Sequence, residues 1–251
     1  MHYHWAMPIQ HRLQRETLVG GWLRDLAVAG AFLTRLPFHP TPPVDMADLG
    51  PAVRVFPLIG LVVGITGGGA LWLAWQLDLQ PMACALIGLA ITTWISGALH
   101  EDGLADFADG IGARDRARRL AIMRDSRIGA FGVLALIFSV GLKVVLLAGI
   151  PSPELAAATL IGAAAASRGV MPLLMFALRP ARADGLGRDA GRPSKPAMGV
   201  AAAFTILILL VFFDWQAALW VHQRWLVQLA AVLQQWLHKR QRALGIITEY
   251  D

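Results

Sequence analysis

Five acidic or imidazole side chains lie within the twelve residues LHEDGLADFADG, residues 99–110. Asp102, Asp106 and Asp109 are spaced by four and then three residues, which places them within roughly 60° of one another on one face of a helix. Three like charges on one face repel each other unless a cation neutralises them. Carboxylate oxygens suit Mg²⁺, which binds one or two carboxylates and is completed by waters and substrate phosphates. The spacing therefore predicts a magnesium site with these three aspartates as ligands and catalytic groups, and a solvated acidic helix end is the alternative.

His100 and Glu101 stand directly before the first aspartate of this motif. Either side chain could accept a proton during catalysis or hold a metal ligand in place. Both are therefore candidate catalytic residues, although a histidine at a membrane boundary is also a common hydrogen-bonding residue. The sequence does not choose between them as the base.

A basic segment, ARDRARRLAIMRDSRIGAFG, follows the acidic motif at residues 113–132. Arg124 and Arg127 are three residues apart, so we expect them on one helical face, where two guanidinium groups could each bind a phosphate through two hydrogen bonds. Asp125 and Ser126 lie between them and either cap the next helix or contact the substrate. These four residues are candidate substrate-binding residues, and the other arginines are candidate topology anchors.

Three further charged residues stand in or beside apolar segments. Lys143 and Arg168 lie near the middle of predicted membrane spans, where an uncompensated charge costs about 2.5 to 3.5 kcal/mol, and such residues usually face a cavity or a partner. Asp184 begins the sequence DGLG in a basic connection. Together with the three aspartates, they predict a polar, substrate-binding pocket that opens to the cytoplasm and suits a phosphorylated, partly bulky substrate.

The elements that would position these residues are membrane helices. The chain has 251 residues, of which 56% are hydrophobic and only 16% charged, far fewer charged residues than the roughly 25% of a soluble domain. A span needs about twenty apolar residues, so the predicted fold is an all-α, polytopic membrane bundle of about six transmembrane helices. The predicted spans are residues 55–77, 81–99, 130–150, 154–178, 197–213 and, less regularly, 215–237.

The distribution of positive charge predicts the orientation of this bundle. Residues 112–127 contain six arginines and residues 179–195 contain four arginines and a lysine, whereas the connections 78–80 and 151–153 contain no positive residue. Because positive loops stay in the cytoplasm, all the basic segments are expected on that side of the membrane. A nucleic-acid-binding surface would have no reason to follow this alternation, so we expect no nucleic-acid partner.

The remaining segments give less information about the fold. Residues 1–20 have no secretory signal pattern and are expected to form a disordered extension, and residues 21–251 are expected to form a single membrane domain. Residues 21–37 have a short amphipathic pattern typical of a helix at the membrane interface. The glycines of residues 60–69 would let helices approach closely. The single cysteine, Cys84, excludes a disulfide framework and a cysteine metal site.

Several motifs between residues 21 and 191 resemble those of one known family, the membrane cobalamin synthases, or adenosylcobinamide-GDP ribazoletransferases. The most specific is an HxDGLADxxDG motif followed by an MRDSRxGxxG motif. The matching stretches, in chain order, are FLTRLP, FPLIGLVVG, HEDGLADFADG, IMRDSRIGAFG, SRG and DGLG.

The resemblance implies an enzyme of the bacterial inner membrane that depends on Mg²⁺. In this family a hydroxyl of α-ribazole, or of its 5'-phosphate, attacks the cobinamide-side phosphorus of adenosylcobinamide-GDP, and GMP leaves. The implied partners are these small molecules and the lipid bilayer, and the oligomeric state is open, a homo-oligomer included. Carboxylates that hold Mg²⁺ and arginines that spread negative charge suit this chemistry.

The C-terminal sequence departs from the family pattern. Family members continue into an LGGxTGD motif and a last apolar helix, whereas HKRQRALGIITEYD keeps only Leu244, Gly245 and Thr248 of that motif. We therefore expect the last family helix to be absent.

Two other functions stay open from the residues alone. A CDP-alcohol phosphotransferase would also place aspartates beside a span, but its motif requires an arginine where Asp106 stands. A small membrane transporter would use Lys143 and Arg168 to line a pathway. Mg²⁺-dependent release of GMP would separate the enzyme from a transporter.

Overall fold

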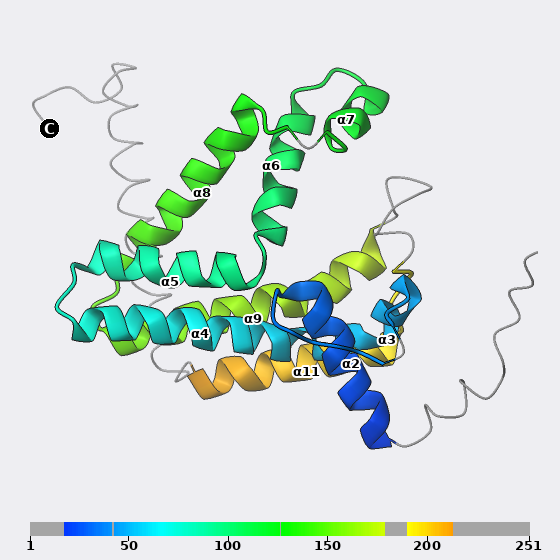
Figure 1. Ribbon diagram of the computed structural model, residues 1–251, viewed down its shortest axis with the longest axis horizontal. Coiled ribbons are helices and arrows are strands. Elements are labelled where there is room, and N and C mark those ends of the chain that lie inside the picture. The colour runs from blue at the N-terminus through cyan, green and yellow to red at the C-terminus, as the bar shows by residue number, and fades with distance from the viewer. Residues whose placement is uncertain (1–17, 42, 126, 179–189, 213–251) are drawn as a thin grey trace, which may run out of the picture. The chain divides into compact units, whose positions relative to one another are not determined.

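The structure, a computed structural model, describes residues 18–41, 43–125, 127–178 and 190–212. Every regular element in these ranges is a helix, which confirms the all-α prediction (Figure 1). The longer helices are α2 (Leu18–Leu33), α4 (Phe56–Gln76), α5 (Pro81–Ile95), α6 (Leu99–Ile111), α8 (Ala130–Ala148), α9 (Pro153–Ala177) and α11 (Lys195–Phe212). The shorter ones are η2 (Met46–Asp48), α3 (Leu49–Ala52), η3 (Val53–Val55) and α7 (Arg116–Ile122).

Four helical segments of the described residues are long and apolar enough to cross a membrane, and a bent pair of helices adds a fifth candidate. The four are Met46–Gln76, Ala130–Ala148, Pro153–Ala177 and Lys195–Phe212. Their limits agree closely with four of the predicted spans, except that the first continues back through α3 and η3 to Met46. The chain thus has the helices of a multi-pass membrane protein. The predicted sixth span, residues 215–237, lies outside the described residues, as do residues 1–17.

The prediction that residues 81–99 form one continuous helix is wrong. α5 ends at Ile95, and α6 begins at Leu99 after a turn that bends the chain by 91°. Gly97 and Ala98 both have the left-handed backbone conformation, with φ of 67° and 57°, which an α-helix cannot continue through. The acidic motif is therefore a helix of its own, at a steep angle to the apolar helix before it.

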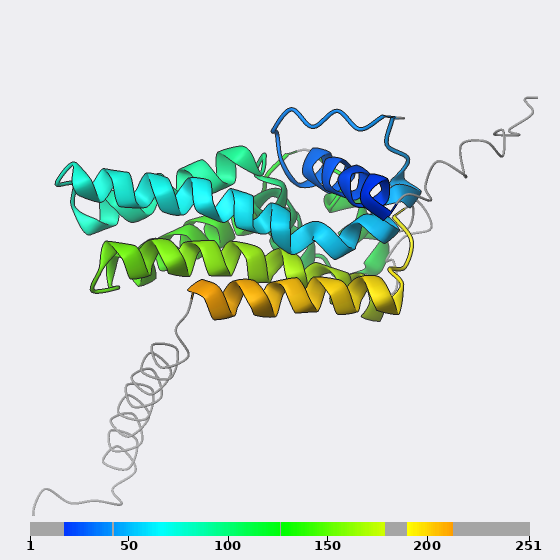
Figure 2. The same ribbon diagram turned by 90° about the horizontal axis from the view of Figure 1, so that it is seen from below.

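Close packing of α4 against α9 forms the centre of the described bundle. Figure 2 shows α4, α9 and α11 side by side along much of their lengths. A Cβ atom added at Gly60 would lie 2.8 Å from the Cα atom of Ala165, and one added at Gly64 would lie 2.7 Å from the Cα atom of Ile161. The glycines of α4 thus let the two backbones approach, as expected from the sequence.

Two apolar clusters lie at opposite ends of α4. At its N-terminal end, buried residues of α2, α3 and η3 surround Phe56 and Ile59. At its C-terminal end, Leu71 and Ala74 pack with residues of α5, α8 and α9, including the buried Cys84. α8 joins the second cluster only through its C-terminal half, so its N-terminal half is free to pack against α6.

Ion pairs that the sequence analysis missed fasten α2 to the start of the α4 region. Arg54 Nε donates to Asp25 Oδ2 at 2.6 Å, and Arg24 Nη2 donates to Asp48 Oδ2 at 2.7 Å. The guanidinium of Arg54 also lies over the ring of Trp22, 3.9 Å from its centroid. The adjacent charges of Arg24 and Asp25 in an otherwise apolar segment are the sequence feature that could have predicted these pairs.

Candidate active site

Helix α6 presents the three predicted aspartates from a single element. Asp102, Asp106 and Asp109 all lie between its limits, so the predicted helical spacing is confirmed. Asp102 is exposed and the other two are partly buried. Among the residues that the structure describes, however, no three acidic, histidine or cysteine side chains converge as a metal site would require. The three aspartates share a helix face but do not form a complete metal-binding site by themselves.

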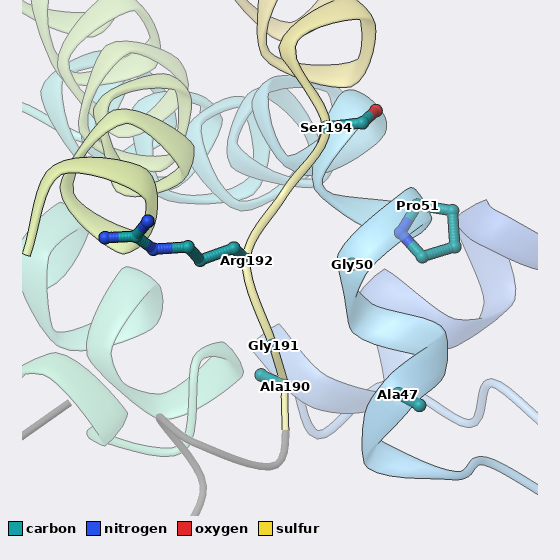
Figure 3. A pocket seen from close by; sticks show the side chains of 7 residues that line it. All are labelled: Ala47, Gly50, Pro51, Ala190, Gly191, Arg192 and Ser194. Atoms are coloured by element: carbon teal, nitrogen blue, oxygen red, sulfur yellow. The ribbon is translucent and has the colours of Figure 1, made fainter. Parts of the chain in front are cut away.

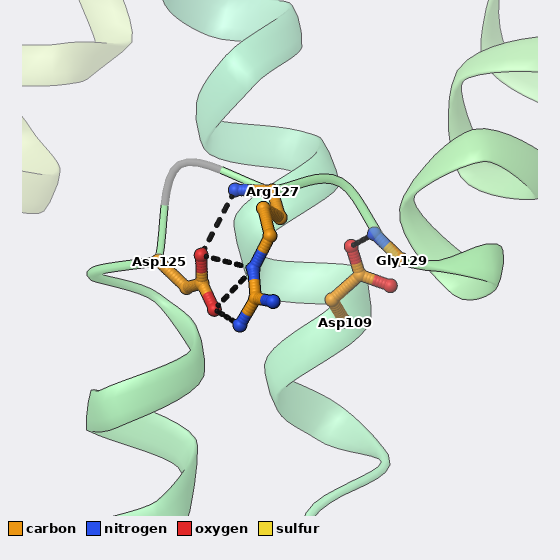
Figure 4. A network of polar contacts seen from close by, with 4 residues as sticks. All are labelled: Asp109, Asp125, Arg127 and Gly129. Atoms are coloured by element: carbon orange, nitrogen blue, oxygen red, sulfur yellow. Dashed lines mark hydrogen bonds and ion pairs between the residues drawn. The ribbon is translucent and has the colours of Figure 1, made fainter.

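The carboxylate of Asp109 points toward the start of α8. Gly129 N donates to Asp109 Oδ2 at 2.7 Å (Figure 4). Gly132 N donates to Asp109 Oδ1 at 2.8 Å. Both carboxylate oxygens of Asp109 therefore accept hydrogen bonds from backbone N–H groups at the first turn of α8. The sequence pattern indicates no such role for Asp109.

The arginine loop, residues 123–129, connects α7 to α8. Because α7 ends at Ile122, Arg124 and Arg127 lie in this loop, and the prediction that they share a helical face is wrong. The physical reason is that Asp125 forms a turn with Arg127, which competes with helical hydrogen bonding. Ser126 lies outside the described residues.

Asp125 binds Arg127 through both its backbone and its side chain. Its Oδ1 accepts from the backbone N of Arg127 at 3.1 Å, and its Oδ2 accepts from Arg127 Nη2 at 2.6 Å (Figure 4). These bonds, above all the one from the side chain, lower the pKa of Asp125 to about 2. Asp125 does not cap α8, since Gly129 is the N-cap residue and Asp109 supplies its hydrogen bonds. The Arg127 side chain is 87% exposed, so it is accessible to a substrate.

A second polar group, formed by residues of three helices, lies beside the start of α6. His100 and Glu101 come from α6, Lys143 from α8 and Arg168 from α9. Lys143 Nζ lies 4.0 Å from Glu101 Oε1, and the charge of Arg168 acts on both His100 and Glu101. The structure therefore brings together four residues that the sequence analysis singled out separately.

Three atoms of this group are buried without a hydrogen-bond partner: His100 Nε2, Glu101 Oε2 and Arg168 Nε. Arg168 is only 7% exposed, and its Nη1 donates to Ser167 Oγ at 3.0 Å. A buried polar atom without a partner costs about 1 to 3 kcal/mol, so such atoms often mark places where a ligand or water binds. These atoms lie where the polar pocket was predicted, which stays a prediction. Asp184, which was expected to contribute to it, lies outside the described residues.

A pocket of about 320 Å³ lies elsewhere, between the η2–α3 region and the segment before α11 (Figure 3). Small residues and Arg192 line it, and none of the predicted site residues does. Ser194 at its edge accepts from Ala197 N at 3.3 Å, a bond at the start of α11.

A family model described as cobalamin-5-phosphate synthase matches residues 25–248 of the chain. Curated proteins named adenosylcobinamide-GDP ribazoletransferase are also similar to it. The one from Bradyrhizobium diazoefficiens is 44% identical over 190 residues, which cover 75% of this chain and 72% of that protein. The one from Brucella anthropi is 41% identical over 207 residues, covering 79% and 78%. The one from Rhizobium etli CIAT 652 is 43% identical over 196 residues, covering 75% of each. No solved structure matches the chain.

These matches decide between the functions that the residues left open. The curated relatives carry the name of a transferase, and neither a lipid phosphotransferase nor a transporter. The family match also continues beyond residue 191, where the motif resemblance ended, to residue 248.

Proposed function

The chain belongs to the cobalamin-5-phosphate synthase family, and we propose that it joins α-ribazole, or its 5'-phosphate, to adenosylcobinamide-GDP with release of GMP. It is a transferase of cobalamin biosynthesis that acts in assembly of the nucleotide loop. The observation that carries the proposal is the family match over residues 25–248, on a chain whose acidic helix is joined directly to an arginine loop.

The proposed reaction requires one bond to form and one to break. A hydroxyl oxygen of the acceptor attacks the phosphorus on the cobinamide side of the diphosphate, and the bond from that phosphorus to GMP breaks. The hydroxyl proton must pass to a nearby acceptor. His100 and Glu101 are the candidates, because each has a buried polar atom without a partner in the protein.

The carboxylates of α6 fit a magnesium ion whose remaining ligands come from the substrate. They do not fit an ion whose ligands all come from the protein. Asp102 and Asp106 are one helical turn apart, and Mg²⁺ commonly takes one or two carboxylates together with substrate phosphates. Asp109 accepts two backbone N–H bonds, and we propose Asp102 and Asp106, one helical turn apart, as the ligands. When bound, Mg²⁺ would neutralise charge on the diphosphate.

Cationic side chains supply the remaining positive charge. Phosphoryl transfer depends mainly on positioning and charge neutralisation, so arginines that reach the diphosphate would stabilise the transition state. Arg124 and Arg127 are exposed in the arginine loop and suit this role. Lys143 and Arg168 are proposed to bind a polar part of the substrate beside His100 and Glu101.

The proposed location is the bacterial inner membrane, with the site facing the cytoplasm. The apolar helices support a multi-pass membrane protein, and the arginine-rich connections support this orientation. The proposed partners are the two small-molecule substrates and the surrounding lipid.

A magnesium titration of GMP release tests this function. Purified protein in detergent or liposomes would receive adenosylcobinamide-GDP and α-ribazole 5'-phosphate or α-ribazole. We expect Mg²⁺-dependent release of GMP by the wild type. Asp102→Asn and Asp106→Asn should each lower turnover at least about tenfold, equivalent to about 1.4 kcal/mol, and should require more Mg²⁺ for the half-maximal rate.

Asp78→Asn is the matched control for these variants. Asp78 is exposed in the α4–α5 connection and has φ of 57°, a conformation that asparagine also tolerates, so this variant should keep the wild-type rate. Wild-type rates and unchanged Mg²⁺ dependence in both α6 variants would remove the proposed metal site. Absence of GMP release by the wild type with either acceptor would contradict the proposed reaction itself.

A further inference from the structure

We propose that Asp109 is a positioning residue, which fastens the arginine loop to the acidic helix and does not bind the metal ion. This inference rests on the proposed function for its catalytic meaning, but its structural part can be tested without any activity. We call the two bonds from Gly129 N and Gly132 N to the Asp109 carboxylate the Asp109 bridge.

The Asp109 bridge replaces the usual cap of a helix. The first backbone N–H groups of a helix lack partners within it, and a capping box satisfies two of them, at the N-cap and N3 positions. Gly129 is the N-cap of α8 and has no side chain to serve this purpose. Asp109 binds these same two positions, Gly129 and Gly132, from a different helix. Its negative charge is also favourable at a helix N-terminus.

The two glycines of the sequence IGAFG are explained by the same contact. The three atoms nearest to a Cβ added at Gly129 all belong to Asp109, with Cγ at 2.8 Å. A Cβ added at Gly132 would also meet the Asp109 carboxylate, as well as Ala105 O of α6 at 3.1 Å. The close approach of α6 to α8 therefore requires glycine at both positions.

The position of the bridge gives it a consequence for the site. Arg127 stands two residues before Gly129, so the bridge holds the end of the arginine loop against the helix that carries Asp102 and Asp106. The acidic face is thereby divided between two tasks. Asp102 and Asp106 are the proposed ligands, whereas Asp109 sets the distance between the acidic helix and the arginine loop.

Limited trypsin digestion measures the bridge directly. Cleavage after Arg127 would be quantified by mass spectrometry against cleavage after Arg35, an exposed arginine outside the site. Asp109→Asn retains one acceptor oxygen but turns an amide donor toward a backbone N–H. We expect cleavage after Arg127 to become about fivefold faster, which corresponds to the loss of about 1 kcal/mol from a helix cap. Asp102→Asn should leave this cleavage unchanged.

A double-mutant cycle tests whether Asp109 and Gly129 act through each other. Gly129→Ala alone should speed cleavage after Arg127, because its methyl group displaces the carboxylate. In the Asp109→Ala background the same glycine substitution should add less than a twofold further effect, since the obstructing atoms are gone. Gly141→Ala is the control on α8, because no atom lies within 4 Å of its added Cβ, and it should leave cleavage unchanged.

The magnesium titration separates a positioning role from a metal ligand. We expect Asp109→Asn to raise the KM for the GDP-bearing substrate while the Mg²⁺ concentration for half-maximal rate stays at the wild-type value. A shifted Mg²⁺ dependence with unchanged trypsin cleavage would make Asp109 a ligand and overturn the proposal. Additive effects of Asp109→Ala and Gly129→Ala on cleavage would also overturn it. The digestion needs no substrate. If the protein did not release GMP, the trypsin results would therefore still test the structural role of Asp109.

Discussion

At the residue scale, Arg127 and Asp125 form the best-defined charged contact of the arginine loop. Arg127 Nε and Nη2 both donate to Asp125, at 3.0 and 2.6 Å. The pKa of Asp125, about 2, lies below its usual 3.8, so the pair is intact at neutral pH and is lost only as the pH falls through about 2. A phosphate that binds Arg127 must therefore displace or share an ionised carboxylate, which has similar acceptor geometry.

Lysine at either arginine of this loop should impair the reaction although it keeps the charge. A lysine ammonium is a point donor and cannot make a two-pronged contact with a phosphate. We expect Arg127→Lys and Arg124→Lys each to lower kcat/KM for GMP release about tenfold, equivalent to about 1.4 kcal/mol. Arg114→Lys, at an exposed position before α7, is the control and should change the rate little. Near-full activity of both test variants would leave the loop arginines as topology anchors.

At the element scale, the positions of α6 and α8 depend on how their ends are fixed. The left-handed Gly97–Ala98 turn sets the direction of α6, and Asp109 joins α6 to the start of α8. α9 brings Arg168 to the same region, because glycines of α4 let α9 pack closely against it. The buried polar atoms of His100, Glu101 and Arg168 therefore depend on the packing of α9 against α4, which includes the turn of α9 just before Arg168.

Alanine at Gly60 should destabilise the protein. The new methyl group would meet the backbone of α9 at Ala165, and overpacking of this kind typically costs about 1 to 3 kcal/mol. A lower midpoint of thermal unfolding in detergent would show this. Gly69→Ala is the control on the same helix, since no atom lies within 4 Å of its added Cβ, and it should be neutral or slightly stabilising. Equal midpoints for the two variants would contradict the close α4–α9 packing.

At the scale of the whole described bundle, the α4–α5 and α8–α9 connections lie at the same end (Figure 1). The C-terminal end of α4, the start of α5, the end of α8 and the start of α9 contribute to one apolar cluster. The connections at that end contain no arginine or lysine, whereas residues 112–127, before α8, and residues 190–195, before α11, are basic. The arrangement suits a bundle oriented by its positive loops.

Cysteine labelling tests this orientation. Cysteines placed at Ala117 and Lys195 should react with a membrane-impermeant reagent from the cytoplasmic side, and one at Gln80 from the opposite side. All three positions are exposed, whereas the native Cys84 is buried and should not react. Labelling of Ala117→Cys and Lys195→Cys from different sides would contradict the predicted topology.

The sequence by itself determined the elements that depend on local patterns. Apolar runs predicted α8, α9 and α11 to within two residues at each end, because a membrane span is defined by its own hydropathy. The four-then-three spacing correctly placed Asp102, Asp106 and Asp109 on one helix, and the motifs around residues 100–132 identified the family that the comparisons show.

Only the tertiary structure decided which partners these residues have. Asp109 binds backbone groups 20 and 23 residues away, and no helical or strand period relates such positions. The break at Gly97–Ala98 was missed because hydropathy continues across it while the backbone does not. Glu101, Lys143 and Arg168 meet because three helices pack together, and burial of a polar atom depends on every neighbour around it. Local sequence specifies helices and their faces, whereas these contacts exist only after the chain has brought distant segments together.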